Sequence, residues 1–220
     1  MSTPQQPMVR ETRQIGLFHQ PEPKVAGIVL AAGSSRRMGR PKQLLPFRGR
    51  TVIERVVENA LASRLQRVIV VLGHEAEHIK PLLEQKNIIT VINNAYETGQ
   101  SSSLKAGLNA IPANFDAALF LLGDQPLVTA ETIDLILASF AESRPPIVIP
   151  TFGGQRGNPV LFSRETFPLM DTLSGDCGAR PLFREYAGRI LSIEVHTPAI
   201  LMDLDTEKDY RRLLRQFPPR

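Results

Sequence analysis

The chain has 220 residues, close to the size of one ordinary domain, of which 42% are hydrophobic and 22% are charged. These fractions are typical of globular proteins and exclude a disordered, collagen-like or coiled-coil chain. The 26 Lys and Arg residues against 22 Asp and Glu give a formal net charge of +4, a modest preference for anionic ligands.

The same composition argues against several partners and compartments. No apolar run approaches the roughly 20 residues that cross a bilayer, and residues 1 to 24 lack the apolar segment of a signal peptide. We therefore expect a cytoplasmic protein without a membrane partner. The single cysteine, Cys177, excludes an internal disulfide and a multi-thiolate zinc site. Basic residues are scattered, aromatic residues make up 6% and Trp is absent, so we expect no nucleic-acid partner.

Strands and helices alternate along most of the chain. Residues 1 to 24 contain four prolines and no apolar period, which predicts a flexible tail before a single domain of residues 25 to 215. Apolar, β-branched runs predict strands at 25–30, 67–72, 88–92, 117–122, 147–149, 160–162 and 190–195. Apolar residues in helical period predict helices at 51–63, 75–85, 101–111, 129–140, 179–186 and 206–214. This order predicts a three-layer, Rossmann-like α/β fold, with a predominantly parallel mixed sheet and helices on both faces.

The first predicted strand runs into a loop that suits a polyphosphate. Gly33 to Lys42 contains two glycines, two serines and the cations Arg36, Arg37 and Lys42. Such a loop exposes backbone N–H groups at the edge of the sheet where ligands bind. Its spacing is neither that of a Walker A loop nor that of a G-x-G-x-x-G dinucleotide turn. The alternative is a solvated turn whose basic residues face water.

Carboxylates follow two other predicted elements. Asp124 comes directly after the most apolar predicted strand, where an ionised group is costly to desolvate unless it holds a cation or is well hydrogen-bonded. Magnesium bridging to a phosphate would satisfy it, and capping of the following turn is the alternative. Asp203 and Asp205 stand at the end of what we expect to be a further strand. Asp205 can instead cap the last helix, which favours Asp203 as the second metal ligand while leaving both open.

Two other features point to different chemistries. His74 to His78 matches the H-E-x-x-H signature of zinc proteases, but no third ligand follows at a suitable spacing, which favours a chance match. Cys177 has no histidine in its segment, and no G-x-S-x-G motif is present. Covalent catalysis is therefore not indicated.

Leu30 to Lys42 (LAAGSSRRMGRPK) resembles the L-A-A-G-x-S-x-R-M-G-x-x-K signature of nucleotidyltransferases that act on small phosphorylated acceptors. In chain order, further segments resemble those of the molybdenum cofactor cytidylyltransferases: GQSSSL at 99–104, GDQP at 123–126, GNPVLF at 157–162, GDCGAR at 175–180 and DLDTE at 203–207. The resemblance runs from about residue 25 to about residue 214. It implies a nucleotidyltransferase fold and transfer of CMP from CTP to the terminal phosphate of molybdopterin, with release of pyrophosphate.

The resemblance also implies partners and site residues. CTP and molybdopterin are the expected substrates, Mg²⁺ the expected cofactor, and a molybdenum hydroxylase or its maturation chaperone a further partner. The expected catalytic residues are Arg37, Lys42 and Asp124, with metal held by Asp124 and Asp203. The expected nucleotide-binding residues are Leu30, Ala31, Ala32, Gly33, Ser34, Ser35, Arg36, Gly39, Gly99, Ser103 and Gly123. The expected acceptor-binding residues are Arg156, Gly157, Asn158, Asp176, Gly178 and Arg180.

Two positions depart from related patterns. Asn158 stands where family members usually carry His, which affects the acceptor contacts. Ala31-Ala32-Gly33 stands where related guanylyltransferases have A-G-G, which favours cytidine over guanosine. The rival hypotheses are a nucleotidyltransferase that uses GTP or a sugar-phosphate acceptor, and a carrier that delivers finished cofactor without chemistry. A nicotinamide-linked reductase is disfavoured because the G-x-G-x-x-G turn is missing.

Overall fold

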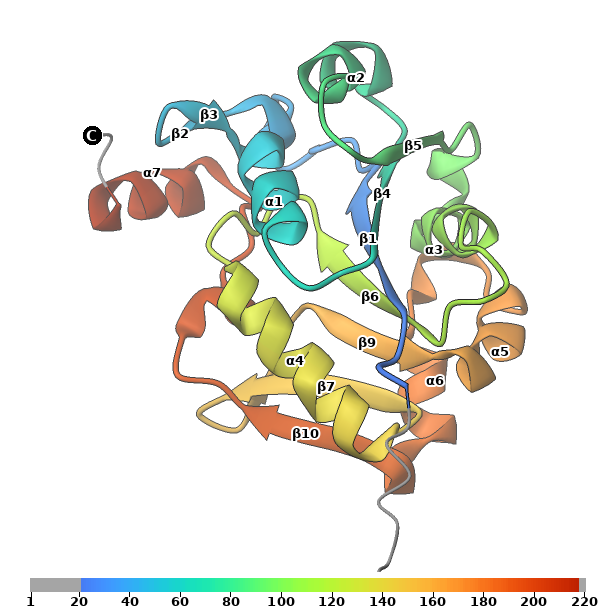
Figure 1. The fold of residues 1–220 in the computed structure, drawn as a ribbon. Helices are drawn as coiled ribbons and strands as arrows, with labels where there is room; N and C mark the ends of the chain where they lie inside the picture. The colour runs from blue at the N-terminus through green and yellow to red at the C-terminus, as the bar shows by residue number, and fades with distance from the viewer. Residues whose placement is uncertain (1–20, 218–220) are drawn as a thin grey trace, which may run out of the picture.

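The computed structural model describes residues 21 to 217. It contains one large sheet, whose strands can be followed from β5 to β10 in Figure 1. The strands run β10-β7-β9-β6-β1-β4-β5, and β8 pairs only with β7. Their bounds are β1 Val25–Ala31, β4 Arg67–Leu72, β5 Ile89–Ile92, β6 Ala117–Leu122, β7 Ile147–Phe152, β8 Gln155–Arg156, β9 Val160–Ser163 and β10 Ile190–Glu194. Because only β8 and β9 run antiparallel to their neighbours, the predicted predominantly parallel mixed sheet is confirmed.

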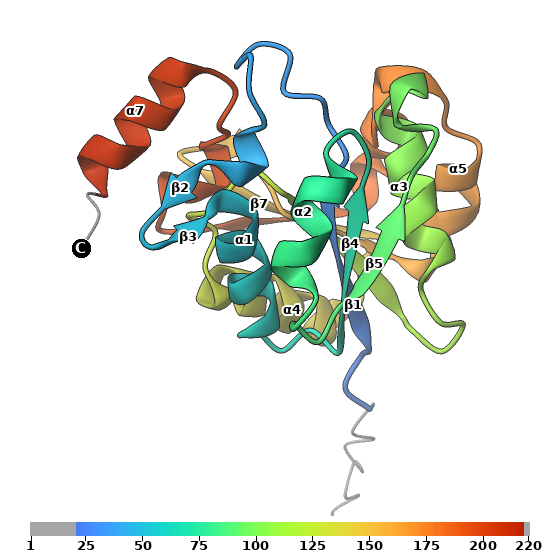
Figure 2. The same ribbon diagram turned by 90° about the horizontal axis from the view of Figure 1, so that it is seen from above.

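Helices cover both faces of the sheet, as predicted. One face carries α1 (Val52–Leu61), α2 (Ala76–Leu83) and α4 (Ala130–Ser143). The other carries α3 (Gln100–Asn109), α5 (Phe167–Asp171) and α6 (Arg180–Glu185). The last helix, α7 (Glu207–Gln216), stands apart from both layers and packs beside the short hairpin of β2 (Pro46–Phe47) and β3 (Arg50–Thr51), as Figure 2 shows.

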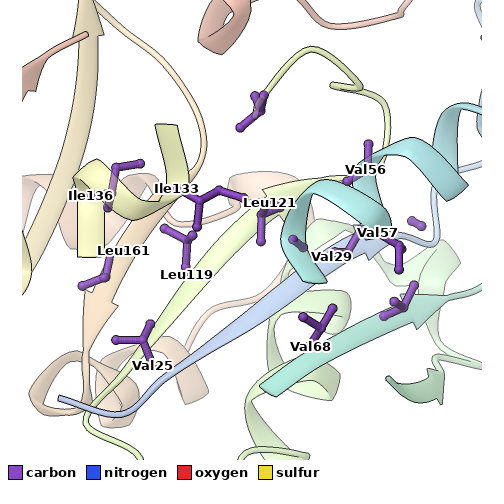
Figure 3. Close-up of a cluster of buried hydrophobic side chains, with 14 of the residues drawn as sticks. Val25, Val29, Val56, Val57, Val68, Leu119, Leu121, Ile133, Ile136 and Leu161 are labelled. Atoms are coloured by element: carbon purple, nitrogen blue, oxygen red, sulfur yellow. The ribbon is translucent and has the colours of Figure 1, made fainter. Parts of the chain in front are cut away.

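Alternation along the strands builds the two halves of the core. Side chains of successive strand residues point to opposite faces, so Val25 and Val29 of β1 lie toward α1 and α4 whereas Ile28 lies toward α3. Figure 3 shows the first of these clusters, in which Leu119 of β6 lies beside Ile133 of α4 and Val29 of β1 lies near Val57 of α1. Burial on both faces explains why these strands are continuously apolar.

The structure differs from the predicted helices and strands at one strand and at several short elements. The expectation that Asp203 and Asp205 end a strand is wrong, because Pro198–Leu201 forms a 3-10 helix and the residues after it are irregular. The pairs β2, β3 and β8 and the five-residue α5 were not predicted, since such short elements carry no recognisable period. The expected flexible tail falls mainly on residues 1 to 20, outside the described residues. Among residues 21 to 217, none of the helices has the length and apolar character to cross a membrane.

Candidate functional site

A cleft of about 820 Å³ opens where β1, β4 and β6 end. Its walls come from the loop after β1, the turn after β4, the start of α3, the loop after β6, and the segments before α6 and α7. Thirteen of the predicted site residues line it: Leu30, Ala32, Gly33, Ser34, Arg36, Arg37, Lys42, Gly99, Ser103, Asp124, Asp176, Arg180 and Asp203. The topology thus brings segments from most of the chain length to one edge of the sheet, as the strand order requires.

Four predicted nucleotide-binding residues do not line the cleft. Ala31 is only 2% exposed and belongs to the core. Gly123 packs on it, since a Cβ at position 123 would lie 2.9 Å from the Ala31 Cβ. Ser35 shapes the loop, because its hydroxyl accepts a hydrogen bond from the Lys42 backbone N–H at 3.1 Å. Gly39 has a φ of 70°, a conformation that favours glycine in the same loop.

Cations of the loop pair with carboxylates from two other segments. The Lys42 Nζ lies 2.5 Å from the Asp124 Oδ2 and 3.2 Å from the Asp205 Oδ1. The Arg37 Nη2 lies 2.8 Å from the other Asp205 oxygen. Burial alone would lower the pKa of Lys42, but the charges and hydrogen bonds of Asp124 and Asp205 raise it above its usual value. Lys42 is therefore a fixed positive charge in the cleft.

The two aspartates before α7 have different surroundings. The Gln125 side-chain amide donates to the Asp203 carboxylate and, at 3.2 Å, to the Ile200 carbonyl. Burial and repulsion from Asp124 raise the pKa of Asp203, although the hydrogen bond from Gln125 opposes this shift. Asp205 does not cap α7: the cap is Thr206, whose hydroxyl accepts from the Asp209 N–H at 3.3 Å. Asp205 is instead the shared partner of the two loop cations.

The donor set of the cleft fits a divalent cation that also contacts phosphate. Within residues 21 to 217, no group of three or more His, Cys, Asp or Glu side chains is arranged to hold a metal ion. Mg²⁺, however, is commonly held by one or two carboxylates together with substrate phosphates. Asp124 and Asp203 line the same cleft, and their mutual repulsion is relieved when a cation lies between them.

The opposite wall is formed by two segments that contact each other closely. The Ser101 hydroxyl donates to the Gly175 carbonyl at 2.8 Å, and the Gln100 backbone N–H donates to the Asp176 carboxylate at 3.1 Å. Gly99, with a φ of 113°, lies so near that an added Cβ would come within 2.5 Å of the Gly175 oxygen. Asp176, predicted as an acceptor-binding residue, therefore also satisfies a free N–H at the start of α3.

Several cleft residues were missed in the sequence. Tyr96 and His74 line the cleft with their rings 5.8 Å apart, and Gln43, Glu97, Gln100 and Leu122 also line it. In the sequence, His74 is notable only as the first residue of the H-E-x-x-H match. In the structure, the Glu75 carboxylate lies 3.5 Å from the His74 ring nitrogen and 2.8 Å from that of His78. An aromatic residue after a predicted strand is the one signal that could have identified Tyr96.

The remaining acceptor-binding predictions lie in two smaller cavities. Arg156, Gly157 and Asn158 line one of about 310 Å³ that Asp203 also borders. Gly178, with Asn158 and Arg180, lines one of about 170 Å³. A larger cavity, about 1150 Å³, lies between α7 and the β2–β3 hairpin, and its lining includes none of the predicted site residues and no carboxylate. We therefore take the 820 Å³ cleft, which gathers charges of both signs, as the candidate site.

A family model described as the MobA-like NTP transferase domain matches residues 27 to 190. The chain belongs to this family. The predicted resemblance is thereby confirmed, and the chain is a nucleotidyltransferase of the MobA-like type.

Curated relatives of this MobA-like chain carry different names at similar identity. Purine catabolism protein PucB of Bacillus subtilis is 33% identical, covering 88% of this chain and 97% of its own length. Nicotine blue oxidoreductase of Paenarthrobacter nicotinovorans is 32% identical, covering 87% and 97%. Molybdenum cofactor cytidylyltransferase of Escherichia coli is 30% identical, covering 83% and 92%.

Solved structures agree with the fold. An Rv0371c homologue from Mycobacterium sp. strain JC1 has a TM-score of 0.79 at 31% identity, covering 88% of this chain and 96% of its own. Rv0371c from Mycobacterium tuberculosis, solved as a complex with manganese, has a TM-score of 0.73 at 30% identity, covering 87% and 98%. These similarities confirm the predicted nucleotidyltransferase fold.

Proposed function

We propose that this MobA-like enzyme transfers CMP from CTP to the terminal phosphate of molybdopterin, giving the dinucleotide form of the cofactor and pyrophosphate. The observation that carries the proposal is the meeting of the cationic loop with the carboxylates: Lys42 lies 2.5 Å from Asp124 in the cleft. A site with both charges can hold a triphosphate and its counter-cation together.

The chemistry needs no protein nucleophile. An oxygen of the acceptor phosphate forms a bond to the α-phosphorus of CTP, and the bond from that phosphorus to the bridging oxygen breaks. The electron pair leaves with pyrophosphate. Because two polyanions must approach, catalysis depends on positioning and on neutralising negative charge. Arg37 and Lys42, with the amides of the Gly33 loop, hold the β- and γ-phosphates of the leaving group.

Asp124 and Asp203 are the residues that would hold Mg²⁺. When bound there, the ion supplies charge neutralisation at the phosphate oxygens next to the reacting phosphorus. Gln125 orients Asp203 for this role, because both hydrogens of its amide are used in fixing the segment that follows Ile200. Burial of these side chains keeps their orientation defined before substrate arrives.

The choice of cytidine is supported by the wall near Ala32. Its methyl group is tightly placed, since a Cβ at Gly73 would come 2.8 Å from it and 2.9 Å from the Tyr96 Cβ. A glycine at position 32, as in the A-G-G pattern of guanylyltransferases, would leave more room for a purine. The base is held between this wall and the Gly99 to Ser103 turn.

One assay tests donor and chemistry together. Radiolabelled CTP, GTP and ATP are each offered with molybdopterin and Mg²⁺, and labelled dinucleotide and pyrophosphate are measured. We expect both products with CTP and far less with the purine nucleotides. Preference for GTP, or turnover only with a sugar phosphate, would overturn the specificity. Absence of pyrophosphate with every nucleotide would favour a cofactor carrier instead.

A further inference from the structure

The cavity of about 1150 Å³ between α7 and the β2–β3 hairpin is separate from the cleft, and Figure 2 shows the two elements that flank it. Within residues 21 to 217, no residue lines both spaces. The cavity is nevertheless built on the segments that carry the acidic residues of the cleft: Leu127 follows Asp124 by three residues, and Met202 directly precedes Asp203. Its volume is large enough for a drug-sized organic molecule. A molecule bound there would contact both acidic segments without entering the cleft.

Apolar side chains form much of the lining of this cavity. Four of them are only partly buried: Leu127, Leu201, Met202 and Phe217. The polar Asn59, in contrast, is already used within the protein, since its side-chain amide donates to the Pro126 and Val128 carbonyls at 3.3 Å and 2.8 Å. Apolar surface that is still in contact with water gains free energy when a ligand covers it. The lining therefore favours a ligand with an apolar body.

The charged side chains among the described lining residues are all cationic: Arg48, Arg55 and Arg212. Two of them have acidic neighbours that do not line the cavity. The Arg55 Nη1 lies 3.2 Å from the Glu58 Oε2, and the Arg212 Nη2 lies 3.9 Å from the Asp209 Oδ1. Arg48 has no carboxylate within 4.0 Å in the part of the chain that the structure describes. An unpaired guanidinium beside an apolar wall favours an anionic group on the ligand.

Arg48 lies in a hairpin turn whose backbone usually takes a different residue. Its φ is 51° and that of Gly49 is 76°, while Phe47 pairs with Arg50 across the turn. Two-residue turns of this kind prefer Asn, Asp or Gly at the first position, because larger side chains are strained at positive φ. The Arg48 guanidinium carbon lies 5.9 Å from the centroid of the Phe47 ring and 5.4 Å from that of Phe217. The turn thus places a cation between the hairpin and the end of α7, against the aromatic part of the cavity lining.

We propose that this cavity is a second ligand site, which binds a small organic anion with an apolar body. The anionic group pairs with Arg48, while Arg55 and Arg212 add positive charge to the same cavity. The ligand is not a reactant of nucleotidyl transfer, because the cavity and the cleft share no lining residue within the described chain. A neutral apolar molecule would leave Arg48 without a partner, and an inorganic anion would leave the apolar wall in water.

Two fluorescent probes test the charge requirement. 8-Anilinonaphthalene-1-sulfonate is an aromatic anion, and N-phenyl-1-naphthylamine has the same ring system without the sulfonate. Arg48→Gln should raise the Kd of the anionic probe by about fivefold, and Arg212→Gln should raise it by a smaller factor. Neither change should affect the Kd of the neutral probe. Arg215→Gln is the matched control, because this exposed residue of α7 carries the same charge but does not line the cavity, and it should change neither Kd.

A second set of variants tests the apolar wall and the location, and does not depend on how R48Q folds. Phe217→Ala should weaken binding of both probes, whereas Leu135→Ala, at a residue of α4 that is 43% exposed and outside the cavity, should weaken neither. Arg37→Gln removes a cation of the cleft and should leave the Kd of the anionic probe unchanged.

Several results would overturn the proposal. These are wild-type affinity for the anionic probe in folded R48Q or F217A, weaker binding of that probe in R37Q, and its displacement by inorganic sulfate. A wild-type dimer that dissociates as the probe binds, measured by analytical ultracentrifugation, would also overturn it, because a second copy of the chain would then cover the cavity. All of these measurements are made without CTP, so failure of the proposed function would leave their outcome unaffected.

Discussion

The Lys42 ammonium and the Asp124 carboxylate lie 2.5 Å apart although 82 residues separate them in the chain. Each side chain is largely buried, at 16% and 10% exposed, so neither charge is free to move far into water. Removing one partner leaves the other uncompensated in a partly desolvated cleft, which is more costly than losing a surface ion pair. The pair therefore links binding of the triphosphate to the integrity of the acidic side of the site.

Replacing Asp124 tests the acidic side. Asp124→Asn keeps the size of the side chain but removes the charge that opposes Lys42 and that would hold the metal. We expect the rate of pyrophosphate release at saturating Mg²⁺ to fall by about 10²- to 10³-fold, the usual effect of losing one electrostatic contact to a transition state. The control is Glu58→Gln, whose carboxylate pairs with Lys86 outside the cleft. Near-normal turnover of a folded D124N would rule out the proposed mechanism.

Replacing Asp205 tests whether this carboxylate pairs with the loop cations or binds the metal ion. It pairs with Arg37 and Lys42, the same cations that the triphosphate needs, so it competes with phosphate for them. Asp205→Asn should tighten metal-free binding of CTP by about fivefold, the equivalent of about 1 kcal/mol. Glu207→Gln is the matched control, since that carboxylate pairs with Arg40, which does not line the cleft. Calorimetric titration measures both; weaker binding in D205N, especially with Mg²⁺, would make Asp205 a metal ligand instead.

Much of the fold was accessible from sequence because the strands buried on both faces are apolar throughout and end at glycine-rich loops. The cation loop and Asp124 were identifiable for the same reason: polar residues directly after such strands must meet at one edge of the sheet. The surroundings of Asp203 could not be predicted from the sequence. Its position depends on the side chain of Gln125 and on the 3-10 helix Pro198–Leu201, which is too short to show a periodic pattern of apolar residues. The aromatic lining of the 170 Å³ cavity was not predicted, because Phe162 and Phe183, on β9 and α6, look in sequence like ordinary core residues.

Gly99 tests the contact between the two segments of the far wall. An alanine there would meet the Gly175 backbone and would have to adopt a φ of 113°. We expect Gly99→Ala to lower the free energy of unfolding by about 1 to 3 kcal/mol and to weaken CTP binding. Gly188→Ala provides the comparison, because an added Cβ at that position has no neighbour within 4 Å. Urea denaturation measures the first effect. A G99A protein as stable as G188A would mean that the two segments readily move apart.

The start of α1 gives a prediction about pH. Thr51 and Glu54 form a reciprocal cap in which the Glu54 carboxylate accepts from the Thr51 N–H and hydroxyl, each at 2.8 Å. Burial would raise the pKa of Glu54, but these hydrogen bonds, with Arg50 and Lys86, lower it below its usual value. A carboxyl group whose pKa is lowered by folding contributes stability above its unfolded pKa, and that contribution is lost as pH falls through the folded pKa.

The difference in stability between wild type and a Glu54 variant is therefore expected to be larger at neutral pH than at acidic pH. Glu54→Gln should lower the free energy of unfolding by about 0.5 to 1 kcal/mol at pH 7, and the difference from wild type should shrink as the pH falls below 4.5, the ordinary pKa of a glutamate. Glu77→Gln, in the first turn of α2, is the control, because no hydrogen bond or ion pair within the described chain involves that carboxylate. Urea denaturation at several pH values measures both variants. A deficit in E54Q that stayed constant from pH 7 to below pH 4 would show that the cap depends on side-chain shape and not on the charge of the carboxylate.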